Sequence, residues 1–176
     1  MSTSETREVW QRGPVGGVPP LLQPVAHALL QAIEDAELYM EDFPAELLWE
    51  RPANVASVGF HLLHIRGVVD RLFTYARGES LSPEQMKELS AEKEMPVEAV
   101  EPARLVHAFD QQVEKALEQL KNTPESILTE ARTIGRKQIP TTVSGLLFHA
   151  AEHVQRHIGQ LLVTARLLQA GTGDHT

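Results

Sequence analysis

The chain has 176 residues, of which 42% are hydrophobic and 23% charged, and this favours one globular domain with a proper hydrophobic core. Its formal net charge of −8 argues against a nucleic-acid partner, because binding a phosphate backbone depends on clustered lysine and arginine. The absence of cysteine excludes disulfides, cysteine–zinc sites and thiol nucleophiles, so a metal site would use histidine, carboxylate, backbone or water ligands.

Residues 1–20 are predicted to form an N-terminal arm that ends in the proline- and glycine-rich segment 13–20. The first 17 residues lack the apolar stretch of a signal peptide, and no run reaches the roughly 20 apolar residues that span a bilayer. We therefore expect a cytoplasmic protein without a membrane partner.

The first half of the chain predicts two long helices and a short one. Apolar residues at helical spacing predict the first helix over residues 22–40, with Leu38 on its apolar face. The second begins at Asn54 or Ser57, either of which can act as N-cap, and ends at Ala76. A short helix follows over residues 83–91, with proline at its first position.

The second half predicts two further long helices, one over residues 102–120 and one from 141 or 142 to about 170, closed by Gly171. Between them, residues 122–140 are predicted to be a long irregular loop, of the kind that often lies over a functional site. The expected fold is all-α: a four-helix bundle over residues 21–171, with the short extra helix between the second and third long helices. Residues 172–176 are expected to form a disordered tail.

The last predicted helix carries His149, His153 and His157 at intervals of four residues. Each interval turns the side chain by about 40°, so the three form a slowly drifting stripe. Measured from the centre of the apolar arc, His157 lies about 70° away, His153 about 110° and His149 about 150°. His153 and His157 therefore lie where a neighbouring helix can reach them, with the spacing at which one helix commonly presents two imidazoles to a metal.

The second predicted helix supplies two more histidines, three residues apart. His61 lies closer to its apolar arc and His64 lies at the edge of that arc, and periodicity alone does not choose between them. Without cysteine, a three-histidine site with open coordination positions is the natural form of a metal centre. In the opposing interpretation, the histidines only line the seam between core and surface of a helical interaction protein that binds no metal.

A second motif overlaps this stripe. Residues 149–153 match H-x-x-E-H, the inverted zinc-peptidase motif, which would make His149 and His153 metal ligands and Glu152 the general base. The match is short, and no downstream carboxylate is placed to complete it. We therefore expect His149 at the rim of the site. Gly159 is interpreted as a point of close helix approach, and Arg71 either faces the mouth of the pocket or forms a salt bridge.

Two motifs together resemble the DinB-like, or YfiT-like, metalloenzyme superfamily. They are SVGFHLLHI followed by YARGE, at residues 57–65 and 75–79, and HAAEHVQRHIGQ at residues 149–160. The resemblance covers about residues 20–170 and implies a four-helix bundle, commonly a homodimer, with a site for one Ni²⁺ or Zn²⁺. The residues that match its ligands are His64, His153 and His157, which leaves His61 and His149 as residues that contact the ligands or line the pocket.

The resemblance also implies a function. Such proteins include metal-dependent transferases and isomerases that use small thiols such as bacillithiol or mycothiol. We expect a metal-dependent thiol S-transferase acting on small electrophiles, or a related hydrolase. The alternative is a non-catalytic metal-binding or stress-response module. In one respect the chain departs from the pattern: members often have arginine or lysine after the last ligand, where this chain has Ile158.

Overall fold

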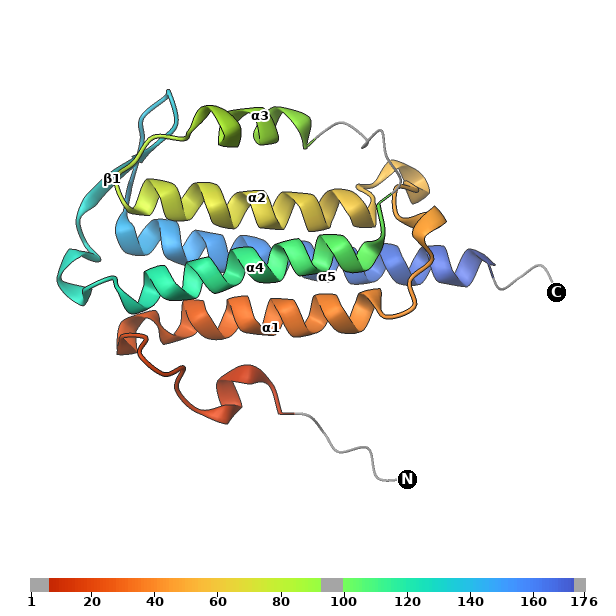
Figure 1. Cartoon of the computed structure of the whole chain (residues 1–176), viewed down its shortest axis with the longest axis horizontal. Coiled ribbons are helices and arrows are strands. Elements are labelled where there is room, and N and C mark those ends of the chain that lie inside the picture. Colours follow the sequence, from red (N-terminus) through yellow and green to blue (C-terminus); the bar gives the residue numbers. More distant parts are fainter. Residues whose placement is uncertain (1–6, 93–99, 173–176) are drawn as a thin grey trace.

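The computed structural model describes residues 7–92 and 100–172, which form a helical bundle (Figure 1). Its four long helices lie side by side and are α1 (Gln23–Met40), α2 (Val58–Ala76), α4 (Pro102–Lys121) and α5 (Val143–Thr172). The short helix α3 (Pro83–Ala91) lies along the outside of α2. The predicted all-α bundle with an extra short helix is therefore confirmed. Most of the predicted tail, at 173–176, lies outside the described residues.

Local capping determines where the helices next to the histidines begin. Ser57, and not Asn54, is the N-cap of α2, because its hydroxyl accepts a hydrogen bond from the backbone N–H of Phe60 at 3.2 Å. Ser82 and Gln85 form a reciprocal capping box at the start of α3. The prediction that Gly171 closes the last helix is wrong, since α5 continues through it to Thr172.

The core lies between the four long helices, and its largest fully buried side chains include Phe73 and Phe109. Leu38 was expected on the buried face of α1, but it is 64% exposed. Small side chains occupy that face instead, namely Ala26, Ala32 and Ala36 beside Leu29 and Ile33. Alanine at these positions lets α1 pack closely against its neighbours. A prediction that counts mainly large apolar residues therefore misplaces the buried face of α1.

The stretch predicted as an irregular loop, residues 122–140, is ordered, and that prediction is wrong. It contains the short helix η5 (Glu125–Ile127) and the strands β1 (Ala131–Ile134) and β2 (Ile139–Thr142). The strands pair antiparallel, with Ala131 opposite Thr142 and Ile134 opposite Ile139. The hairpin packs at the end of α2, where Arg132 Nε donates to the carbonyl of Ala76 at 3.0 Å. With α3 it lines a cavity of about 820 Å³ whose lining includes none of the site histidines.

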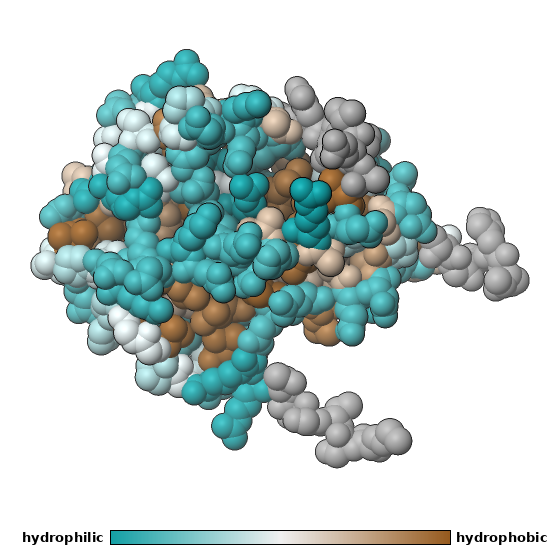
Figure 2. All heavy atoms as spheres, viewed as in Figure 1, coloured by the Kyte–Doolittle hydropathy of each residue, from teal (hydrophilic) through white to brown (hydrophobic). Residues whose placement is uncertain are grey.

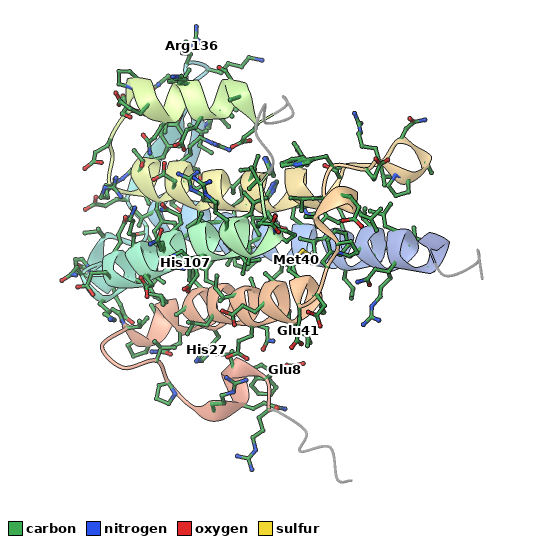
Figure 3. All side chains as sticks on the ribbon, turned by 45° about the vertical axis from the view of Figure 1, so that its right-hand side comes forward. Glu8, His27, Met40, Glu41, His107 and Arg136 are labelled. Carbon is green, nitrogen blue, oxygen red and sulfur yellow. The ribbon has the colours of Figure 1, made fainter. Side chains whose placement is uncertain are left out.

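The described part of the predicted arm, residues 7–20, lies against α1. It contains η1 (Val9–Arg12), and the side chains of Val9 and Val18 are buried. Arg12 pairs with Glu34 at 2.5 and 2.7 Å, and Glu8 and His27 lie where the segment runs beside α1 (Figure 3). Three more single-turn helices complete the chain: η2 (Pro20–Leu22), η3 (Ala45–Leu47) and η4 (Pro52–Asn54).

Hydrophilic side chains cover much of the face seen in Figure 2, and apolar side chains show in gaps between them. Across residues 7–92 and 100–172, no helix combines the length and the apolar character that a membrane crossing requires.

Alanine substitutions at two helical glycines are expected to have opposite effects on stability. A Cβ on Gly59 would lie 2.6–2.8 Å from ring atoms of Trp49, so Gly59→Ala should lower the free energy of unfolding by about 1–3 kcal/mol. No atom of the described residues lies within 4 Å of a Cβ on Gly159, so the interpretation of Gly159 as a point of close helix approach is wrong. Gly159→Ala should raise the free energy of unfolding by about 0.5–1 kcal/mol. Urea denaturation measures both; equal effects would contradict this packing.

Candidate metal centre

The centre forms where α2 and α5 pack against each other in opposite directions. One ring nitrogen from each of His64, His153 and His157 lies within 4.8 Å of the other two. His64 Nε2 and His153 Nε2 are 3.0 Å apart. The antiparallel packing thus joins one histidine of α2 to two of α5, about 90 residues later in the chain.

His61 lies one turn before His64 and faces the same helix. Its side chain is buried, at 3% exposure, and its Nδ1 is 2.9 Å from Nδ1 of His157. This contact engages Nδ1 of His157 and leaves Nε2 of the same ring for the centre. His61 is absent from the group of three converging nitrogens, and it lies directly behind one member of that group.

Sequence reasoning missed Glu92, the residue that follows α3. Glu92 Oε2 is 2.9 Å from His64 Nδ1, and Glu92 also pairs with Arg71 of α2. Of the two interpretations of Arg71, the structure thus shows the salt bridge. No spacing rule links Glu92 to His64, because the contact joins two helices across 28 residues. The hint in the sequence was an acidic residue ending a short helix that folds back along α2.

His149 lies on the exposed side of the stripe. Its side chain is 48% exposed, and its Nδ1 contacts Glu152 at 2.9 Å. His149, Glu152 and His153 form a second group with converging ligand atoms, at the positions of the H-x-x-E-H match. Glu152 is already engaged by Arg156, at 2.5 and 2.6 Å, which leaves it a poor general base.

A family of known proteins matches most of the chain. The model of the DinB superfamily matches residues 28–161, which is about three-quarters of the chain (134 of 176 residues) and includes the three converging histidines. The chain belongs to the DinB superfamily.

A solved structure supports the same fold. The DinB-superfamily chain is similar to a conserved protein from Enterococcus faecalis, with a TM-score of 0.66 and 19% sequence identity. The match covers 85% of this chain and 98% of the other. No protein with a curated description matches the chain.

The donor set of this DinB-superfamily chain fits a divalent metal. Burial, followed by the proximity of His64, lowers the pKa of His153 to about 4 and that of His157 to about 3. Both imidazoles are therefore neutral at pH 7, the form that binds metal. Two nitrogens at about 2.0–2.1 Å from one ion lie roughly 3–3.4 Å apart, and the His64–His153 separation falls in that range.

One ring nitrogen of the centre is buried without a partner in the described part of the chain. His153 Nδ1 is buried and has no hydrogen-bond partner among the described residues. An unsatisfied buried polar atom costs about 1–3 kcal/mol. The three rings are thus held together at a cost in stability.

Ile158, where members of the family often carry a basic residue, is 2% exposed and belongs to the core. The basic side chain nearest to it in sequence is Arg156, which is exposed and paired with Glu152. Position 158 of α5 therefore supplies no positive charge beside the histidines.

Proposed function

We propose that this DinB-superfamily protein holds one Zn²⁺ or Ni²⁺ ion on His64, His153 and His157, and transfers a small thiol to small electrophiles. The observation that carries the proposal is the convergence of three ring nitrogens from two helices within 4.8 Å. Three histidines leave coordination positions open, which is the condition for a catalytic rather than a purely structural metal site.

When bound, a divalent cation lowers the pKa of a thiol or water that takes an open position. In the reaction the thiol loses its proton, its sulfur bonds to the electrophilic carbon, and the leaving group departs with the electrons of the broken bond. The proton passes to solvent, because both carboxylate oxygens of Glu152 are already held by Arg156. Phe60, whose ring stacks on His64 with centroids 5.3 Å apart, provides an apolar wall for the electrophile.

Removal of the metal tests this function. Protein stripped by a chelator should lose thiol-transfer activity, and reloading with Zn²⁺ or Ni²⁺ should restore it. The assay combines bacillithiol, mycothiol or glutathione with a small alkyl halide and measures the thioether by mass spectrometry. Full activity in the stripped protein would contradict a metal-dependent transferase.

Two other outcomes would favour the alternative functions. Protein that holds one metal ion per chain but converts no thiol–electrophile pair is a non-catalytic metal-binding module. Protein that binds no metal at saturating Zn²⁺ or Ni²⁺ is a helical interaction protein whose histidines only line the seam between α2 and α5.

A further inference from the structure

Glu92 is the carboxylate that reaches the histidine cluster from outside the four-helix bundle. Its Oε2 is 2.9 Å from His64 Nδ1, and its Oε1 pairs with Arg71 Nη1. The side chains of Glu92 and Arg71 are 9% and 10% exposed. Because water has little access, these two contacts account for how the carboxylate is held.

The face of α2 beneath this carboxylate is shaped to receive it. His64, Gly67 and Arg71 follow one another at intervals of three and four residues, and therefore lie on one face of α2. A Cβ at Gly67 would overlap Glu92 Oε1 and meet Arg71 Nη1. The glycine thus leaves the space in which Glu92 lies between Arg71 and His64.

This arrangement determines which nitrogen of His64 carries the proton. An ionised carboxylate can only accept hydrogen bonds, so the donor in the Glu92–His64 contact is Nδ1–H. The lone pair of the neutral ring is then on Nε2, the nitrogen that faces His153. A carboxylate behind a histidine ligand commonly orients the ring and selects its tautomer in this way.

We propose that Glu92 is a positioning residue of the metal centre, which holds His64 in the Nδ1–H tautomer so that Nε2 is directed to the metal. The inference rests on the proposed metal site, and it adds that metal binding depends on the placement of α3. Helix α3 has no fully buried residue and is joined to α2 largely by polar contacts, such as Gln85 Nε2 to Asp70 Oδ2 at 2.7 Å. Glu92 links this helix to the centre.

The substitution Glu92→Gln should weaken Zn²⁺ binding by about 10- to 100-fold, although it keeps the shape of the side chain. Arg71 has only donors, so the single amide oxygen of glutamine must face Arg71. The amide NH₂ group then points at His64 Nδ1 and favours the tautomer with the proton on Nε2. Glu92→Ala leaves Nδ1 without a fixed partner, and we expect a mixture of tautomers with a smaller loss of affinity.

Glu88 provides a matched control. It lies one turn before Glu92 on α3 and pairs with Arg66 of α2 at 3.2 Å, and it contacts no histidine in the described part of the chain. Glu88→Gln removes the same charge from the same helix and should leave Zn²⁺ affinity within twofold of the wild type. Affinity is measured by competition with a chromogenic chelator, and the tautomer of His64 by ring ¹⁵N chemical shifts in the metal-free protein.

The tautomer measurement separates positioning from a merely structural role. An Nδ1–H tautomer in the wild type that shifts towards Nε2–H in Glu92→Gln supports the inference. A wild-type His64 protonated on Nε2 overturns it, whether or not the variants fold, and so does an unchanged tautomer in folded Glu92→Gln. Wild type and Glu92→Gln that bind Zn²⁺ equally contradict the inference alone. A wild type that binds neither Zn²⁺ nor Ni²⁺ contradicts the proposed function as well.

Discussion

Replacing His157 by alanine is expected to weaken Zn²⁺ binding by about 100-fold, because a ligand contributes roughly 3 kcal/mol of binding free energy. The ring of His157 lies 4.6 Å, centroid to centroid, from those of both His64 and His153. Its Nδ1 is engaged by His61, which directs Nε2 towards the centre. Loss of the ring would leave two ligands, too few to hold the ion firmly.

His149 is the matched control, because it lies as far before His153 on α5 as His157 lies after it. It belongs only to the second group of converging residues, with Glu152 and His153, and its side chain is 48% exposed. His149→Ala should leave affinity within twofold of the wild type. Elemental analysis and chelator competition on protein purified without an affinity tag measure both variants. Metal lost in His149→Ala but kept in His157→Ala would move the site to the H-x-x-E-H motif.

The metal-free protein should lose stability as the pH falls below about 6.5. Burial is the first cause that lowers the pKa of His61 and His153 to about 4 and that of His157 to about 3, from an ordinary 6.5. Between these values the unfolded chain takes up protons that the folded protein does not. Stability is therefore complete above pH 6.5 and declines towards pH 4 and 3, by up to about 1.4 kcal/mol per pH unit for each histidine kept neutral.

Urea denaturation in the presence of a chelator, at pH 7.5 and pH 5.5, measures this loss. His157→Gln should have a shallower dependence on pH than the wild type, because one neutral imidazole is gone. His107 lies exposed on α4 (Figure 3), and His107→Gln should keep the dependence of the wild type. Equal stability of the wild type at the two pH values would mean that the folded protein protonates its site histidines as readily as the unfolded chain does.

Helical periodicity predicted much of the fold because each long helix has a strong pattern of its own. It misplaced Leu38, since a face built from alanines gives a weak signal, and it missed the hairpin of β1 and β2, whose pairing joins residues on either side of a turn. The periodicity of a single helix also could not choose between His61 and His64. One helix's pattern places both near the seam, and only the packing of α5 decides which ring each of them meets.

In the metal centre, some relations follow from spacing along one helix and others from the packing of different helices. The sequence by itself determined that His153 and His157 share one side of a helix and that His149 points further out, because those relations follow from 3.6 residues per turn. Only the tertiary structure decided that His64 meets His153, that His61 lies behind His157, and that Glu92 reaches His64 across Gly67. Those contacts join different helices, and their geometry depends on how the helices pack rather than on any spacing along the chain.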